Sequence, residues 1–184
     1  MKLLHIDSSA LSSQSITREL SASIVRHEQD KNPSLEVVYR DLDQNPLPHF
    51  TAQSFAPSPE QSQLFERVLQ ELLEADIVVV GAPMYNFSIP STLKAWIDRV
   101  AVAGKTFRYT ENGPLGLLGN KKVWIASGRG GIHGNGSSDF QETYLRQIFA
   151  FLGVDDLSIV RAEGVALSPS HKEQALKEAH ALLQ

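Results

Sequence analysis

The stretch HIDSSALSSQSITREL, residues 5–20, leads from an apolar run through a hydroxyl-rich loop into a segment of helical period. Ile16, Leu20 and Ile24 repeat every four residues, as on the buried face of an amphipathic helix. The same succession of short apolar run, loop and helical segment recurs along the rest of the chain. This repetition decides the fold.

Five short apolar runs rich in β-branched residues predict strands, and they span residues 2–6, 35–40, 76–82, 122–127 and 157–162. Helical patterns separate them, and one of these is the i, i+3, i+4, i+7 spacing of Leu93, Trp96, Ile97 and Val100. About five helices alternating with five strands indicate an α/β protein whose parallel sheet has helices on both faces. We expect one domain over residues 1–184, with irregular segments at 41–57 and 104–121 that are candidates for function.

The composition excludes several classes of function. A net charge of −4 and a pI near 5.8 leave no broad basic face for nucleic acid or anionic lipid. The absence of cysteine excludes disulfides and thiolate chemistry and is typical of a reducing cytoplasm. The six histidines lack metal-ligand spacing, and no apolar segment approaches the roughly 20 residues that span a bilayer. We therefore expect a cytoplasmic protein with no metal and with neither nucleic acid nor membrane as a partner.

In an open parallel sheet, ligands bind beyond the carboxyl ends of the strands, so the loops after the first, third and fourth strands are candidates. The first loop carries six hydroxyls within residues 8–17 and opens a helix whose free N–H groups attract phosphate. It lacks the glycines of a dinucleotide fingerprint and the lysine of a Walker loop, so we expect it to hold a terminal phosphate without transferring it. Arg18, the one cation nearby, is expected to face solvent. The alternative is that the serines only cap the helix.

The second loop, PMYNF at residues 83–87, places two aromatic rings and a methionine at the end of a buried strand. These side chains offer stacking and sulfur contacts to a flat ring, although Met84 and Phe87 are equally expected as core residues under a loop. The third loop, SGRGG at 127–131, lets the backbone approach a ligand closely. Arg129 is expected either to offer charge to an electron-rich ring or to be solvated. A phosphate loop, a ring loop and a glycine loop together fit one flavin mononucleotide (FMN) per chain, bound non-covalently.

These stretches also carry a resemblance. HIDSSALSSQSITREL, GAPMYNFSIPSTLKAWIDRV, AGKTFRYTENGPLGL and SGRGG resemble, from Lys2 to about Gly164, the FMN-dependent NADH:quinone oxidoreductases, also called azoreductases. The resemblance implies a flavodoxin-like, doubly wound, five-stranded parallel sheet of strand order 2-1-3-4-5. It also implies a homodimer that passes a hydride from NAD(P)H to FMN and then to quinones or azo bonds.

The resemblance assigns site residues by position. It implies contacts to the FMN phosphate from Ser9, Ser15, Ile16 and Thr17, of which Ile16 uses its backbone. It implies contacts to the isoalloxazine ring and ribityl chain from Pro83, Met84, Tyr85, Asn86, Phe87, Gly128, Arg129, Gly130 and Gly131. It implies a substrate wall that includes Tyr109 and Phe151, supplied by the other subunit. The chain departs from the family at Gly128, where many relatives have Ser or Thr, and in a shorter segment 51–60.

Because the flavin carries the chemistry, no catalytic side chain is expected. Backbone N–H groups and Arg129 are expected to stabilise the negative charge that develops toward N1 and C2=O of the ring. A planar donor and a planar acceptor that stack on one flavin face in turn predict ping-pong kinetics. Two other classes remain open, a flavodoxin-like electron carrier and a flavoprotein that senses quinones without turnover. Steady-state consumption of NADH with a quinone separates the enzyme from both.

Overall fold

The computed structural model describes residues 1–134 and 139–183. It is a flavodoxin-like α/β structure built on a five-stranded parallel sheet in which the strands are ordered β2-β1-β3-β6-β7. These strands are β1 (Lys2–Asp7), β2 (Glu36–Asp41), β3 (Ile77–Pro83), β6 (Lys122–Gly128) and β7 (Asp156–Ala162). All five apolar runs of the sequence are therefore strands, each within one residue of its expected bounds.

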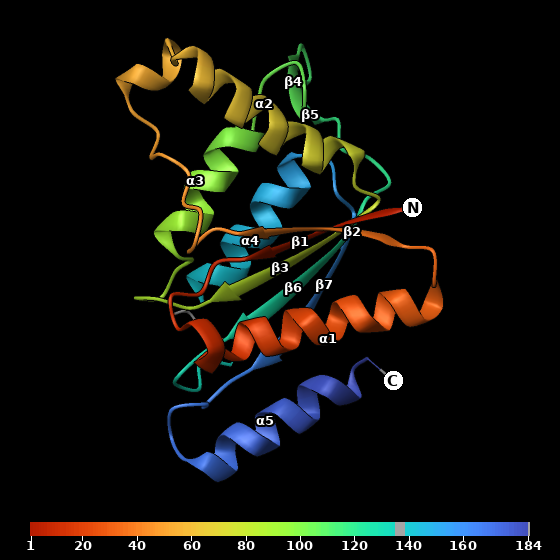
Figure 1. Ribbon diagram of the computed structural model, residues 1–184, viewed down its shortest axis with the longest axis vertical. Helices are drawn as coiled ribbons and strands as arrows, with labels where there is room; N and C mark the ends of the chain where they lie inside the picture. Colours follow the sequence, from red (N-terminus) through yellow and green to blue (C-terminus); the bar gives the residue numbers. More distant parts are fainter. Residues whose placement is uncertain (135–138, 184) are drawn as a thin grey trace.

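Helices cover both faces of this sheet, as Figure 1 shows. On one face lie α1 (Ile16–Lys31) and α5 (Pro169–Ala181), and on the other lie α2 (Pro59–Glu74), α3 (Ser91–Val100) and α4 (Phe140–Phe151). Two short 3-10 helices, η1 (Ser12–Gln14) and η2 (Ala52–Phe55), lie in the loops after β1 and β2. The helix expected from the spacing of Leu93 to Val100 is confirmed as α3.

The central strand β3 shows why both faces must be covered. All of its seven residues are buried, because successive side chains point to opposite faces and each face packs against helices. Val78 and Val80 belong to the cluster under α2, α3 and α4, whereas Ile77 and Val79 belong to the cluster under α1 and α5. The strand therefore ends in a rigid framework, from which the following loop projects.

The expected strand order needs one correction. Counted over all strands of the described chain it is 2-1-3-6-7 and not 2-1-3-4-5, because the segment expected to be irregular contains a hairpin. Its strands, β4 (Phe107–Thr110) and β5 (Gly113–Gly116), pair antiparallel in a separate two-stranded sheet. The sequence pattern does not predict β5, because three of its four residues are glycine or proline, and both residue types are depleted in sheets.

The hairpin is anchored to the end of α4 by a close backbone approach. A Cβ atom on Gly153 would lie 2.8 Å from the carbonyl carbon of Gly116, and one on Gly116 would overlap the backbone of Gly153. Gly153 also has a φ of +93°, a conformation that glycine commonly adopts just after a helix. The N–H of Leu118 donates to the carbonyl of Leu152 at 2.9 Å and closes the junction.

Candidate functional site

The hydroxyl loop joins β1 to α1 and divides its hydroxyls between interior and surface. Ser9, Ser15 and Thr17 are buried, as is Ser8, whose hydroxyl donates to the carbonyl of Gly81 at 2.7 Å. The two serines of η1 are exposed. Ser15 is the N-cap of α1 and accepts a hydrogen bond from the backbone of Arg18 at 3.3 Å. The loop therefore both caps α1, through Ser15, and places a cluster of hydroxyl groups in the interior.

The start of α1 has the features of an anion site. The N–H groups of Ile16 and Thr17 donate no hydrogen bond within the described residues, as expected for the first turn of a helix. The hydroxyls of Ser15 and Thr17 lie 3.0 Å apart beside them. Free amides, paired hydroxyls and the positive end of the helix dipole converge here, which favours a phosphate group.

Arg18 does not face solvent, contrary to expectation. Its guanidinium binds both carboxylate oxygens of Asp41, at 2.6 and 2.9 Å, and donates to the carbonyl of Ser9 at 2.9 Å. These hydrogen bonds lower the pKa of the Asp41 carboxyl below its ordinary value. The Tyr39 hydroxyl donates to buried Asp7 at 3.0 Å, and burial together with the charge of Asp7 raises the pKa of Tyr39. Arg18 therefore connects the hydroxyl loop to the end of β2 through hydrogen bonds to both.

The loop after β3 is a tight and strained turn. Tyr85 and Ser88 exchange backbone hydrogen bonds of 2.9 and 3.1 Å, and the two residues between them have positive φ angles. These angles are +50° for Asn86 and +67° for Phe87. A bulky residue such as phenylalanine rarely adopts this conformation, and such backbone strain is concentrated at functional sites.

Side chains of this turn are available to a ligand. Phe87 is 53% exposed, so it does not belong to the core, and its ring meets His133 edge to face at 5.8 Å. Met84 and Tyr85 are half-buried, Asn86 is exposed, and Pro83 is buried at the end of β3. The turn therefore presents an aromatic surface at the sheet edge where the hydroxyl loop lies.

Direct hydrogen bonds hold the three loops together. The Tyr85 hydroxyl accepts from the backbone N–H of Ala10 at 3.1 Å and lies 3.3 Å from the hydroxyl of Ser9. The backbone N–H of Met84 donates to the carbonyl of Gly128 at 2.8 Å. The fully buried amide of Gln141, which the sequence analysis did not single out, donates to the carbonyl of Ala82 at 2.8 Å. The structure thus brings the three expected loops into one site.

Gly128 packs directly against the hydroxyl loop. A Cβ atom at this position would lie 2.7 Å from the Cγ2 methyl group of Thr17. The threonine methyl group therefore fills the space that a side chain at residue 128 would need, which explains glycine there. The N–H groups of Gly130 and Gly131 donate no hydrogen bond within the described part of the chain.

The guanidinium of Arg129 is not solvated, which corrects one of the two expectations for this side chain. It is fully buried and binds three carboxylates, those of Asp139 at 2.7 Å, Glu163 at 3.1 Å and Glu142. Its backbone N–H also donates to the carbonyl of Ala162 at 2.9 Å. Arg129 therefore connects the glycine loop to the start of α4 and the end of β7.

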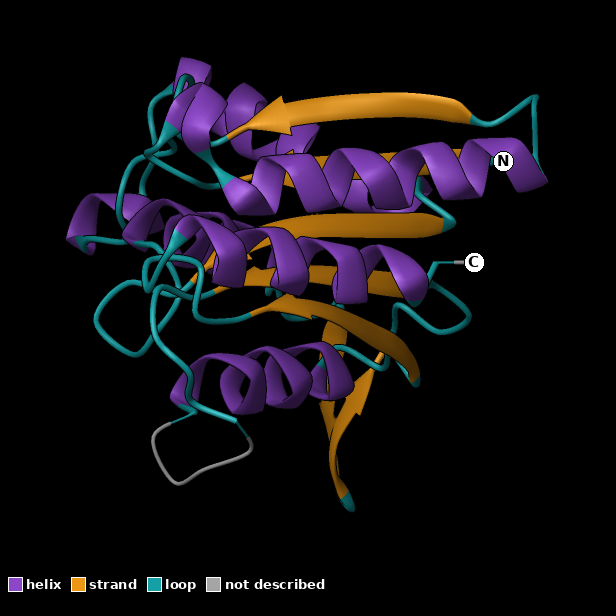
Figure 2. Cartoon of the chain, turned by 90° about the horizontal axis from the view of Figure 1, so that it is seen from below, coloured by secondary structure: helices purple, strands orange, loops and turns teal. Residues whose placement is uncertain are grey.

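Tyr109 and Phe151 lie together, but away from the three loops. Both contact Phe107, with ring centroids 5.5 Å from Tyr109 and 4.6 Å from Phe151, and Tyr109 is 76% exposed. The ion pair between Arg129 and Asp139 places the start of α4 at the carboxyl edge of the sheet. A helix of 12 residues spans about 18 Å, so Phe151 lies at the opposite end. Figure 2 likewise shows the hairpin projecting away from that edge.

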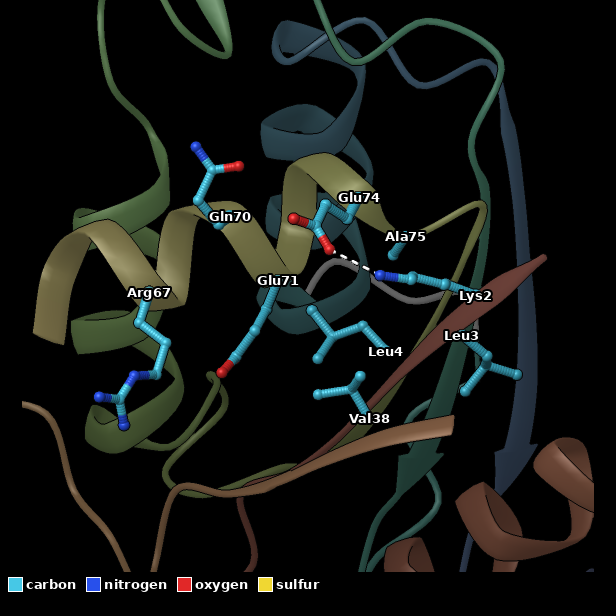
Figure 3. A pocket seen from close by; sticks show the side chains of 9 residues that line it. All are labelled: Lys2, Leu3, Leu4, Val38, Arg67, Gln70, Glu71, Glu74 and Ala75. Atoms are coloured by element: carbon cyan, nitrogen blue, oxygen red, sulfur yellow. Dashed lines mark hydrogen bonds and ion pairs between the residues drawn. The ribbon is translucent and has the colours of Figure 1, made fainter. Parts of the chain in front are cut away.

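A separate cavity of about 200 Å³ lies between α2 and the amino ends of the strands, as shown in Figure 3. It is lined by Leu4 and Val38 and bordered by the ion pair between Lys2 and Glu74, whose atoms are 2.8 Å apart. This position is at the wrong end of the sheet for the strand-end site. Within the described residues no three His, Cys, Asp or Glu side chains are arranged so that they could hold a metal ion, and none of the helices has the length and hydropathy of a membrane span.

The sheet order and the strand-end loops define a flavodoxin-like protein. A family model described as a flavodoxin-like fold matches residues 1–184, which shows that the chain belongs to that class. The chain is also similar to the azoreductase of Bacillus anthracis strain Sterne, with 27% identity and a TM-score of 0.87 over 100% of this chain and 98% of that one.

More similar relatives specify the family. The chain is 60% identical to FMN-dependent NADH:quinone oxidoreductase 1 of Xanthomonas axonopodis pv. citri, over 97% of this chain and 93% of that protein. It is 60% identical to the FMN-dependent NADH:quinone oxidoreductase of Xanthomonas oryzae pv. oryzae strain KACC10331, over 100% and 95% of the two chains. The chain therefore belongs to the FMN-dependent NADH:quinone oxidoreductase family and is an oxidoreductase.

Proposed function

We propose that this chain, acting as one domain over residues 1–184, binds one FMN non-covalently and transfers hydride from NADH to quinones and azo bonds. The observation that carries this proposal is the joining of three loops at the carboxyl edge of the sheet, where an anion site and an exposed aromatic turn adjoin. The names of the similar proteins, which are NADH:quinone oxidoreductases and an azoreductase, support the same reaction class.

The phosphate is assigned to the start of α1. Ile16 and Thr17 supply backbone N–H groups, and Ser9, Ser15 and Thr17 supply hydroxyls. Among the described residues the start of α1 offers no free side-chain cation, because Arg18 is bound to Asp41. A site made of neutral donors holds a phosphate firmly but does not favour its transfer.

The flavin ring and ribityl chain are assigned to the other two loops. The N–H groups of Asn86, Phe87, Gly130 and Gly131 donate no hydrogen bond within the described chain and are available to the polar edge of the ring. Pro83, Met84 and Tyr85 complete the turn, while Gly128 and Arg129 bring the glycine loop against it. Preorganised amides of this kind stabilise negative charge without rearranging, so they replace the guanidinium of Arg129 in that role.

FMN, when bound, supplies the chemistry of accepting and donating a hydride. The residues of the chain bind and orient it, keep the strained turn in place and limit the access of water on one side. The exposed ring of Phe87 leaves one open area for planar molecules. We propose that NADH and the acceptor use this area in turn, which is a ping-pong mechanism.

We further propose that the working unit is a homodimer. Phe151 lies about one helix length from the start of α4, and Tyr109 contacts the same ring of Phe107, so we infer that neither walls the site of its own chain. A site on one chain alone is open to water, whereas hydride transfer benefits from an enclosed pocket that holds the acceptor. A second chain that offers the exposed Tyr109 and the neighbouring Phe151 would close each site.

A mixed dimer tests this arrangement. One chain carries Ser15→Ala with Asn86→Pro, and the other carries Tyr109→Ala with Phe151→Ala. If each wall comes from the partner, the intact flavin site meets an intact wall and the mixed dimer recovers activity that neither parent dimer has. A fully active monomer, or a mixed dimer as inactive as its parents, would contradict shared sites.

The proposed reaction is tested by cofactor release and turnover. Acid precipitation of the reconstituted protein is expected to release FMN, and the protein is expected to consume NADH continuously with a quinone or an azo dye. Release of FAD would contradict the assignment of the cofactor. Stoichiometric reduction without turnover would instead indicate an electron carrier or a quinone-sensing protein.

A further inference from the structure

Gly128, the last residue of β6, is a glycine that its own backbone does not require. Its φ angle is not positive, and it ends a regular strand in which its Cα partners are Pro83 and Ala162. Glycine weakens a strand, so its presence at such a position indicates the close approach of another part of the chain. The approaching group is the side chain of Thr17, in the first turn of α1.

The contact between these two residues leaves no room for a side chain at residue 128. A Cβ atom there would lie 2.7 Å from the Cγ2 methyl group of Thr17. The next atoms, the backbone N of Thr17 and Cβ of Ile16, would be 3.8 and 3.9 Å away, which is ordinary contact. The methyl group of Thr17 alone therefore fills the gap at Gly128, the space that a side chain of this residue would take.

Neither backbone is free to withdraw from this contact. The carbonyl of Gly128 accepts from the N–H of Met84 at 2.8 Å, and the N–H of Arg129 donates to the carbonyl of Ala162 at 2.9 Å. Thr17 is only 2% exposed, and its helix packs against β3 and β6. A group added at residue 128 is therefore accommodated by rotation of the Thr17 side chain and not by movement of the strand.

The position of the Thr17 hydroxyl follows from the position of its methyl group. Both groups are carried by one Cβ atom, so they move together among three staggered positions. In the observed position the hydroxyl lies 3.0 Å from the hydroxyl of Ser15, beside the free N–H groups of the first turn. Because α1 begins at Ile16, no carbonyl of this helix lies three or four residues earlier to hold the hydroxyl elsewhere. Filling the gap at Gly128 thus selects the position in which the hydroxyl faces the anion site.

We propose that Gly128 is a positioning residue for the phosphate of FMN and acts through the methyl group of Thr17. The inference rests on the proposed phosphate site at the start of α1 and adds the residue that orients one of its hydroxyls.

The stereochemistry of threonine makes this role specific. If an alanine at residue 128 filled the gap, only the hydrogen on Cβ of Thr17 could face it. The three substituents of Cβ have a fixed order, so this rotation puts the methyl group where the hydroxyl had been, beside Ser15. A serine at residue 17 has a second hydrogen in place of the methyl group. It can turn a hydrogen toward the alanine and still keep its hydroxyl beside Ser15.

A double-mutant cycle tests this role with FMN and riboflavin, which differ only in the phosphate. The dissociation constants of both flavins are measured by fluorescence titration of the full chain. Gly128→Ala is expected to weaken FMN about tenfold or more, because a hydrogen bond to a charged group is lost, and to leave riboflavin within about threefold. Thr17→Ser combined with Gly128→Ala is expected to bind FMN within about threefold of the wild type, because the hydroxyl is restored.

Two further variants make the result independent of how well Gly128→Ala folds. Thr17→Ser alone leaves the gap empty and gives the hydroxyl three positions, so it is expected to bind FMN about threefold more weakly than the double variant. Gly131→Ala, in the same loop, is the matched control. Its Cβ would lie 3.4 Å from Nε2 of His133, and any effect on the flavin ring should be shared by FMN and riboflavin.

The rotation itself can be measured without a flavin. Three-bond NMR couplings to the methyl carbon of Thr17 are expected to show one rotamer in the wild type and a different one in Gly128→Ala. An unchanged rotamer, equal losses of FMN and riboflavin in Gly128→Ala, or losses of FMN affinity that simply add in the double variant would overturn the inference, while the wild type still prefers FMN. A wild type that binds riboflavin as tightly as FMN would overturn the proposed phosphate site as well.

Discussion

Replacing Ser15 with alanine separates the two roles that the structure gives to this residue. Its hydroxyl caps α1 by accepting from the backbone of Arg18 at 3.3 Å, and it lies 3.0 Å from the hydroxyl of Thr17 beside two free N–H groups. The first role concerns the stability of the empty protein. The second concerns the phosphate of FMN, which riboflavin lacks.

Each role has its own magnitude. Loss of a serine N-cap costs about 1 kcal/mol, which lowers the melting temperature of a domain of this size by about 2–4 °C. Loss of a hydrogen bond to a charged phosphate costs about 1.5–3 kcal/mol, which weakens FMN about 10- to 150-fold. Riboflavin, without a phosphate, should bind the variant nearly as well as the wild type.

The assay is fluorescence titration of FMN and of riboflavin with the empty protein, beside its thermal unfolding curve. Ser13→Ala is the matched control, because Ser13 is exposed in the same loop and its side chain makes no hydrogen bond to any residue that the structure describes. The control should leave both affinities unchanged. If Ser15→Ala weakened FMN and riboflavin equally, the hydroxyl would serve capping alone and the phosphate assignment would be refuted.

Three further predictions concern the rest of the structure. Gly153→Ala should lower the free energy of unfolding by about 2–4 kcal/mol, because the strain of a φ of +93° adds to a clash with Gly116. The variant should also slow the acceptor reaction while it still binds FMN. Gly104→Ala is the control and should cost less, since Gly104 has a φ of +80° but open space around it. The free energy of unfolding should differ most between wild type and Asp41→Asn at a pH above 3.8, the ordinary pKa of the carboxyl. This difference should shrink as the pH falls through the lowered pKa of Asp41 in the folded protein. A difference in unfolding free energy that stays constant during acid titration would contradict the role of Arg18. Double-reciprocal plots with varied NADH and quinone should give parallel lines, and intersecting lines would require both substrates to be bound together.

The sheet could be predicted from the sequence because its signals are local. A run such as 76–82 is apolar throughout, which already indicates a strand buried on both faces. The N-cap of α1 and the glycine after α4 are also short-range features. The hairpin at residues 107–116 was missed because its strands are four residues long and one of them contains glycine and proline.

The site could be predicted only in part, because its side chains are governed by distant partners. Arg18 is bound by Asp41, 23 positions away, and Arg129 by Glu163, 34 positions away, so neither guanidinium could be placed from its neighbours. The positive φ angle of Phe87 has no sequence signal, since glycine and asparagine are the residues expected in such a conformation. The sequence pattern did predict the positions of the three loops, because each loop directly follows a predicted strand.

An anaerobic titration tests whether FMN bound to this chain carries hydride from NADH to a quinone. The FMN-loaded protein is mixed with NADH in steps, then with a quinone, while the visible absorption of the flavin is followed. One equivalent of NADH is expected to bleach the flavin completely, and one equivalent of quinone to restore its absorption, over repeated cycles. A protein that retains no flavin, or a reduced flavin that the quinone leaves bleached, would contradict the proposed reaction.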